Sequence, residues 1–212
     1  MSCPICAKRK AERFCPAKGE RICAVCCGTE REVTLDCPGD CTYLITAHRY
    51  EDQHRKPLPE SEVPYPSVEF PPHLIHEQRP LLSGLGVTIL QFAATQKSLS
   101  DADVLSALNA MAETFRTLGS GIYYEKPPEA ALPHLLYGEL SKFLAEFKKQ
   151  DAERTGFSRV KDTEIFHLLI FLLRVGKHQT NGRPRSKHFL EFLRAQFPKP
   201  ATEAETPRII LP

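Results

Sequence analysis

The nine residues from Ile165 to Leu173 read Ile-Phe-His-Leu-Leu-Ile-Phe-Leu-Leu and belong to the longest apolar stretch of this 212-residue chain. Apolar side chains would cover nearly every face of a helix with this sequence, and such a helix belongs at the centre of a bundle. The stretch is too short to span a bilayer, which needs about 20 apolar residues. We therefore predict a buried helix in a helical domain, and no membrane association.

Four further helices are predicted around this central one. Apolar residues recur at intervals of three and four, which lays one stripe along a helix, at Val104, Leu108, Met111, Phe115 and Leu118. A second stripe of the same kind consists of Leu136, Leu140, Phe143 and Phe147. The last helix begins near Ser186 and ends at Pro198. The first, about Leu81–Gln96, has the weakest pattern because Gly84 and Gly86 interrupt it.

Proline content separates this domain from the N-terminal part of the chain. Residues 57–80 contain seven prolines, which fix φ and remove backbone donors, so this segment is predicted to be an extended linker. The predicted organisation is a cysteine-rich module at 1–56, the linker at 57–80, a bundle of about five helices at 81–198 and a loose tail at 199–212. The predicted fold class is mainly α, with short hairpins inside the module, for example around Arg31–Asp36.

Cysteine usage is the sharpest functional signal in the sequence. All eight cysteines lie in the first 41 residues, several of them at the two-residue spacing that lets two thiolates on one turn reach the same ion. Zinc takes four such ligands in a tetrahedron, so eight thiolates fill two closed, structural sites. The predicted ligands of two zinc ions are Cys3, Cys6, Cys15, Cys23, Cys26, Cys27, Cys37 and Cys41.

The assignment of cysteines to the two sites has two solutions. Cys26 and Cys27 are neighbours and would strain a single site, which favours an interleaved arrangement of Cys3, Cys6, Cys23 and Cys26 against Cys15, Cys27, Cys37 and Cys41. The alternative fills the first site in chain order, with Cys3, Cys6, Cys15 and Cys23. His48 is a substitute for a late cysteine, although its distance from Cys41 favours a surface histidine. Iron–sulfur clusters and disulfides are the less favoured uses of these thiols.

The cysteine segment, residues 3–41, resembles the HIT-type zinc finger and, more loosely, the B-box. The matching residues are Cys3-Pro4-Ile5-Cys6, Ala11-Glu12-Arg13-Phe14-Cys15-Pro16 and Ile22-Cys23-Ala24-Val25-Cys26. The resemblance implies interleaved, cross-braced zinc sites and contacts between proteins in assembly complexes. The chain departs from the family pattern at Lys18, where the family has a cysteine, and at Cys37 and Cys41, where it has a histidine and a cysteine. Cys27 is the candidate replacement ligand.

Charge is unevenly distributed although the formal net charge is only +2. Residues 174–199 carry seven Lys or Arg and one acid. The predicted loop at 177–188 is therefore a candidate nucleic-acid contact through Lys177, Arg183, Arg185 and Lys187, because such side chains donate to phosphate. The alternative is a solvated loop that keeps an apolar bundle soluble.

These patterns argue against an enzyme and leave two functions to compare, an adaptor and a nucleic-acid-binding regulator. The sequence has no nucleophile elbow, phosphate-binding loop or dinucleotide fingerprint, so we do not expect an enzyme. We expect a cytoplasmic, non-enzymatic adaptor whose structural zinc module binds another protein, while the bundle binds a second partner or dimerises. The alternative is a nucleic-acid-binding regulator that uses the basic loop. Two zinc ions on eight thiolates add negative charge to the module, which favours protein contact.

Overall fold

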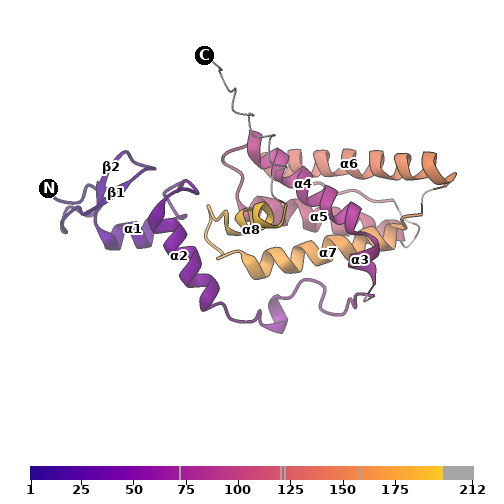
Figure 1. Cartoon of the computed structure of the whole chain (residues 1–212), viewed down its shortest axis with the longest axis horizontal. Helices are drawn as coiled ribbons and strands as arrows, with labels where there is room; N and C mark the ends of the chain where they lie inside the picture. Colours follow the sequence, from indigo (N-terminus) through magenta and orange to yellow (C-terminus); the bar gives the residue numbers. More distant parts are fainter. Residues whose placement is uncertain (72, 120, 122, 158, 198–212) are drawn as a thin grey trace, which may run out of the picture.

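The computed structural model describes residues 1–71, 73–119, 121, 123–157 and 159–197 of the chain. Helices dominate the described part, and an N-terminal cysteine cluster accompanies one small sheet, so the predicted mainly helical fold is confirmed (Figure 1). The strands are β1 (Arg13–Cys15) and β2 (Glu20–Ile22). The helices are α1 (Ala24–Glu30), α2 (Thr42–Gln53), α3 (Leu74–Glu77), α4 (Arg79–Thr95), α5 (Asp101–Gly119), α6 (Ala131–Thr155), α7 (Asp162–Gln179) and α8 (His188–Gln196), with a 3₁₀ turn η1 (Glu60–Glu62). The predicted tail at 199–212 lies outside the described residues.

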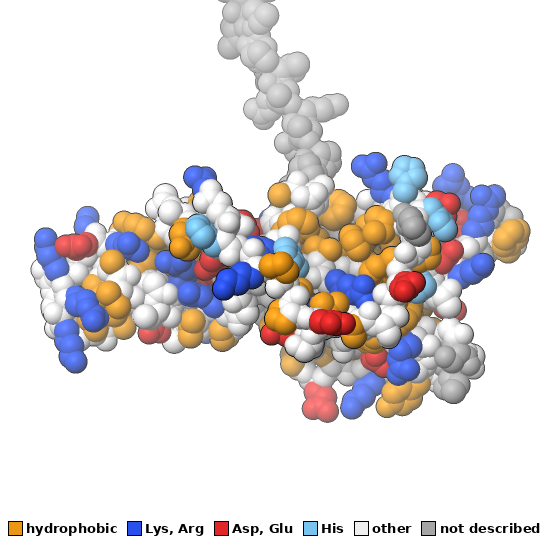
Figure 2. Space-filling view, turned by 90° about the horizontal axis from the view of Figure 1, so that it is seen from below, with side chains coloured by type: hydrophobic (Ala, Val, Ile, Leu, Met, Phe, Trp, Pro, Cys, Tyr) orange, Lys and Arg blue, Asp and Glu red, His pale blue; other side chains and the backbone are white. Residues whose placement is uncertain are grey.

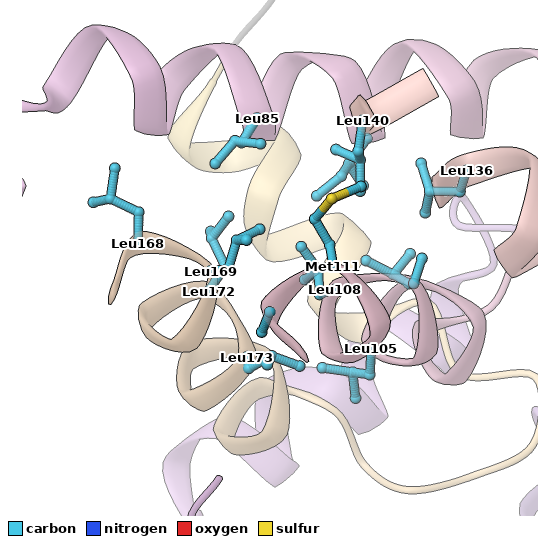
Figure 3. Packing of buried hydrophobic residues seen from close by; sticks show 14 of the residues in the cluster. Leu85, Leu105, Leu108, Met111, Leu136, Leu140, Leu168, Leu169, Leu172 and Leu173 are labelled. Atoms are coloured by element: carbon cyan, nitrogen blue, oxygen red, sulfur yellow. The ribbon is translucent and has the colours of Figure 1, made fainter. Parts of the chain in front are cut away.

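Helices α4 to α8 form the bundle, which agrees with the five helices predicted. Helix α5 packs along α7 and against α6, α6 lies along α4, and the short α8 contacts α4, α5 and α7. The fully buried side chains of Leu108, Met111, Leu140, Leu168 and Leu169 meet between these helices (Figure 3). The apolar stretch Ile165–Leu173 therefore lies in the core. No helix in the described part is both long and apolar enough to cross a membrane.

The glycines of α4 explain why this helix continues through a sequence that looked interrupted. A Cβ on Gly84 would lie 2.1 Å from the Phe143 ring of α6, and a Cβ on Gly86 would lie 2.4 Å from the Phe197 ring after α8. Each glycine thus lets an aromatic ring lie directly on the helix backbone. The packing gained offsets the intrinsic cost of about 1 kcal/mol for glycine in a helix.

The proline-rich segment lies along α7, and one side chain holds much of it there. The guanidinium of Arg174 donates hydrogen bonds to the carbonyls of Pro64, Tyr65 and Val68, and it stacks 4.7 Å from the centre of the Phe70 ring. Residues 57–80 also contain η1, α3 and the first two residues of α4. His167 of α7 is half-buried beside Phe70.

The cysteine module, at the left of Figure 1, contains the hairpin at a different place from the one predicted. Strands β1 and β2 pair antiparallel, and Gly19 adopts the left-handed conformation that their turn requires, with φ of 69°. Residues 31–36, where the hairpin was expected, form only an isolated bridge between Arg31 and Leu35. The backbone curls there because the Glu30 carbonyl accepts the N–H groups of three following residues.

Candidate metal centre and its contacts with the bundle

Four of the eight cysteines converge on one point in the module. The sulfur atoms of Cys3, Cys6, Cys23 and Cys26 all lie within 4.8 Å of one another, and the Cys6 and Cys23 sulfurs are 3.9 Å apart. Tetrahedral zinc with sulfur at about 2.3 Å implies sulfur–sulfur distances of about 3.8 Å. This cluster can therefore hold one metal ion. The grouping is that of the interleaved arrangement and differs from filling in chain order.

The local backbone structure positions these four thiols. Cys23 caps the N-terminus of α1, and its sulfur accepts a hydrogen bond from the Cys26 backbone N–H at 3.4 Å. The buried Ile22, the last residue of β2, fixes the start of this helix against the hairpin. The Cys3–Cys6 turn closes back on itself, because the Ala7 N–H donates to the Cys3 carbonyl at 2.7 Å. The Cys3–Cys6 turn and the start of α1 thus face each other across the cluster.

The acidities of these thiols are unequal. Backbone hydrogen bonds from Lys8 and Arg9 lower the pKa of Cys6 to about 6, which favours the thiolate. Burial and the neighbouring thiols raise the pKa of Cys26 to about 12. The reason is that a Cys26 thiolate would place a second negative charge in the buried cluster. A divalent cation removes this conflict by binding all four thiolates. The donor set is thus suited to zinc.

The second group of cysteines shares one small cavity. Cys15, Cys27, Cys37 and Cys41 all line a space of about 10 Å³ beneath Leu44. Burial raises the pKa of Cys37, and nearby Cys41 and Cys15 raise it further. Within the described residues, however, these sulfurs do not approach one another as the first four do. The structure therefore shows one closed four-cysteine cluster and a looser second set.

His48, Glu51 and His188 offer a third set of potential metal ligands within 4.8 Å of one another. The rings of His48 and His188 are nearly parallel, with centroids 4.1 Å apart and 9° between their planes. Imidazole lone pairs lie in the ring plane, so one ion cannot be in line with both stacked rings. This geometry argues against a metal there.

His48 instead forms an ion pair with two carboxylates. Its Nδ1 lies 2.8 Å from Glu191 of α8, and its Nε2 lies 3.0 Å from Glu32 of the module. Burial alone would lower the pKa of His48, but hydrogen bonds to Glu191 and Glu32 outweigh it and raise the pKa to about 10. His48 is only 4% exposed, so the prediction of a surface histidine was wrong.

Glu32 is the centre of the contact between the module and the bundle. Its carboxylate also accepts hydrogen bonds from the Asn181 side chain at 2.8 Å and the Lys187 backbone N–H at 3.3 Å. Burial would raise the pKa of Glu32, but its hydrogen bonds to His48 and Asn181 lower it. Its backbone lies in the left-handed region with φ of 53°, a conformation that costs a non-glycine residue about 1 kcal/mol or more. Such strain persists only where surrounding contacts hold it.

The basic loop between α7 and α8 binds the module of the same chain. Arg183 donates to the carbonyls of Arg31 at 2.6 Å and Gly28 at 3.2 Å, close to the end of α1. Lys187 reaches the Asp36 carboxylate at 2.7 Å and the Lys97 carbonyl at 2.8 Å. Two of the four predicted nucleic-acid-binding side chains are therefore engaged internally.

The remaining two candidates, Lys177 and Arg185, have exposed side chains. The Arg185 backbone N–H nevertheless donates to the Glu32 carbonyl at 2.8 Å, so this residue too belongs to the contact. Figure 2 shows basic and apolar side chains intermingled over the module on the face drawn. The four candidates therefore do not act as one free cationic surface.

Asp101, the first residue of α5, anchors the other side of the same loop. Its carboxylate is fully buried and accepts hydrogen bonds from the Ser186 hydroxyl and from the backbone N–H groups of Phe189 and Leu190. It thus caps the N-terminus of α8 from a distant part of the chain. Nothing local in the sequence indicates this role, since the capped helix begins 87 residues later.

Comparison with known proteins gives no family for this chain: no family model, curated protein or solved structure matches it significantly.

Proposed function

We propose that this protein is a non-enzymatic adaptor whose zinc-closed module presents a protein-binding surface, while the helical bundle supports it. The proposal includes two structural zinc ions, one on the four-cysteine cluster and one on the second set after a small inward movement of its sulfurs. It also includes the HIT-type resemblance, because the interleaved grouping of Cys3, Cys6, Cys23 and Cys26 matches the cross-brace that this resemblance implies.

The observation that carries the adaptor function is a pair of exposed apolar residues beside the cluster. Ile5 is 37% exposed and Val25 is 47% exposed. Each lies between the two cysteines of a Cys-x2-Cys turn, and both turns belong to the same four-sulfur cluster. Phe14, on β1 of the same module, is 54% exposed. Metal binding would fix both apolar side chains on one rigid unit, as suits the core of a protein interface.

The test compares two module variants in an affinity purification from the native cell. Ile5→Asp combined with Val25→Asp should lose the specific partner proteins that the unmodified chain retains. Val33→Asp changes an equally exposed apolar residue of the same module, away from the Cys-x2-Cys turns, and should retain them. Zinc content, measured in each preparation, shows that the module is intact. Identical sets of co-purified proteins for all three chains would contradict the proposal.

The runner-up function is nucleic-acid binding by the basic loop. The internal contacts of Arg183 and Lys187 weigh against it, because phosphate would have to displace the Arg31 carbonyl and the Asp36 carboxylate. Fluorescence anisotropy with mixed-sequence DNA and RNA over a series of salt concentrations tests it. We expect no binding at physiological salt. Binding that weakens steeply with salt, and that is lost on changing Lys177 and Arg185 to Ala, would favour this alternative.

A further inference from the structure

A large groove lies where the module meets the bundle. It encloses about 1110 Å³ between the module segment 36–39, helix α4 and helix α8, at the end of the bundle nearest the module (Figure 1). The Lys187 side chain at the start of α8 donates to the Lys97 carbonyl at 2.8 Å, and the Phe197 ring after α8 lies against Gly86 of α4. The two helical walls are therefore held together at both ends of α8.

Apolar side chains dominate these helical walls. On α4 they recur at the spacing of one helix face, as Val87, Leu90 and Ala94, and α8 and its end add Leu190 and Phe197. Val87 is 40% exposed, so this apolar surface is open to solvent. A pocket for a small ligand instead encloses about 70–90% of the ligand surface. An open apolar groove of this size suits a segment of protein that continues beyond it.

We propose that the groove binds an acidic amphipathic helix of a partner protein, with its apolar face against α4 and α8. The size of the groove supports a helix. Lys187 and Phe197 both line it and are ten residues apart, which corresponds to about 15 Å of helix. Over that length, about 1110 Å³ gives a width of about 10 Å. That is the diameter of an α-helix with its side chains, and about twice the spacing of an extended strand from its neighbour.

Backbone hydrogen bonding also favours a helical occupant. Two of the three walls are helices, whose backbone groups are already paired along most of their length, so they offer few partners to an extended peptide. A helix satisfies its own backbone and needs only apolar contacts from the groove. Recognition of this kind uses apolar anchors at intervals of three and four residues along the bound helix.

The charges around the groove favour an acidic partner. The charged side chains that line it within the described residues are Asp36, Lys97, Lys187, Glu191 and Arg194. Asp36 is paired with Lys187 at 2.7 Å, and Glu191 is paired with His48 at 2.8 Å. Lys97 and Arg194 are exposed, and neither has an ion-pair partner in the part of the chain that the structure describes. The unbalanced charge is therefore positive, and carboxylates beside the apolar face of the partner helix can pair with it.

A pair of synthetic helices tests the proposal. The first probe is a fluorescein-labelled peptide, EALEELLAELEA, with a hydrocarbon staple between its last two alanines. The staple preforms a helix that is otherwise too short to be stable in water, with the leucines on one face. The second probe has lysine in place of every glutamate. By fluorescence anisotropy we expect the acidic peptide to bind the full-length chain, and the lysine peptide to bind at least about tenfold more weakly.

Two substitutions test the apolar wall. Val87→Glu should weaken binding of the acidic peptide at least about tenfold, because it places a charge where the apolar face must lie. Leu135→Glu changes a residue of α6 that is 53% exposed and should leave binding unchanged. Both positions are exposed, and circular dichroism of each variant shows that the fold is retained.

A reversal of charge tests the choice of partner. Lys97→Glu combined with Arg194→Glu should reverse the preference, so that the lysine peptide binds more tightly than the acidic one. The control is Lys142→Glu combined with Lys149→Glu, which makes the same change of net charge at exposed positions of α6. That control should keep the original preference.

Equal binding of the two peptides, or binding that Val87→Glu leaves intact, would overturn the proposal. So would a dimer, seen by sedimentation, that Val87→Glu dissociates, because the groove would then hold a second copy of the chain. Binding of oleate that Val87→Glu abolishes, with no binding of either peptide, would identify a lipid site and also overturn it. Ile5→Asp combined with Val25→Asp should bind the acidic peptide normally, since neither residue lines the groove. The result is thus separate from the adaptor surface proposed above.

Discussion

Cys26 and Cys27 are adjacent on α1, yet their side chains serve different parts of the module. The Cys26 sulfur belongs to the four-cysteine cluster, whereas Cys27 lines the small cavity with Cys15, Cys37 and Cys41. Successive residues of a helix point about 100° apart, so one short helix supplies both sets of thiols. This division is the residue-level basis for proposing two separate metal sites.

Combining serine substitutions tests whether the two cysteines hold different ions. Cys26→Ser should remove one zinc equivalent, because an alcohol is a much poorer zinc ligand than a thiolate. Adding Cys3→Ser should remove no more, since Cys3 belongs to the same four-sulfur cluster. Adding Cys27→Ser should remove the second. Elemental analysis provides the measurement, and a Cys26→Ser, Cys27→Ser chain that still holds one zinc would contradict the assignment.

Gly176 provides a test of packing with a matched control. A Cβ there would lie 2.6 Å from Leu105 and 2.9 Å from Phe189, in the contact of α7 with α5 and α8. Gly176→Ala should therefore destabilise the bundle by about 1–3 kcal/mol despite its better helix propensity. Gly138→Ala on α6 meets nothing within 4 Å and should stabilise by up to about 1 kcal/mol. Urea unfolding measures both, and equal midpoints for the two variants would refute the packing argument.

At the scale of elements, the helices could be predicted because their signals are local. The stripe from Val104 to Leu118 lies within α5, and the expected start near Ser186 is close to that of α8. The grouping of Cys3 and Cys6 with Cys23 and Cys26 was also accessible, from the strain argument at Cys26 and Cys27. The contacts of Glu32, Asp101 and Glu191 were not, because each depends on residues far away in the sequence. The resemblance to a known finger family stays an expectation.

Helix α8 depends on the buried Asp101 carboxylate of α5. Asp101→Ala should leave the first N–H groups of α8 without acceptors and cost about 1–3 kcal/mol. Amide hydrogen exchange at Phe189 and Leu190 should accelerate far more than exchange in α6. Asp101→Asn keeps one acceptor oxygen and should have a smaller effect. Unchanged exchange at these amides in the alanine variant would show that the cap is dispensable.

At the scale of the whole molecule, the contact between module and bundle should weaken at high pH. The folded-state pKa of His48 is raised to about 10, whereas the unfolded value is about 6.5. Its contribution is therefore complete below about pH 6.5 and is lost progressively as the pH rises to 10.

Comparison with a His48→Gln variant isolates this effect. The difference in unfolding free energy between the two chains should shrink steadily from pH 6.5 to pH 10, as followed by urea denaturation. A difference that stays constant over this range would mean that His48 is neutral in the folded protein. The metal centre is a poor explanation for any change, because both chains retain all eight cysteines.

The basic loop that clamps the module has a consequence for synthesis of the chain on the ribosome. Arg183 contacts Gly28, which lies 155 residues earlier. At about 5–20 residues per second, translation needs roughly 8–30 s to cover that distance. The module can bind metal and fold early in this interval. Glu32 and His48, however, cannot make their contacts with Asn181, Lys187 and Glu191 until those residues have been synthesised. A nascent chain therefore carries an undocked module, with the charged side chains of Glu32 and His48 exposed to solvent, until α8 has emerged.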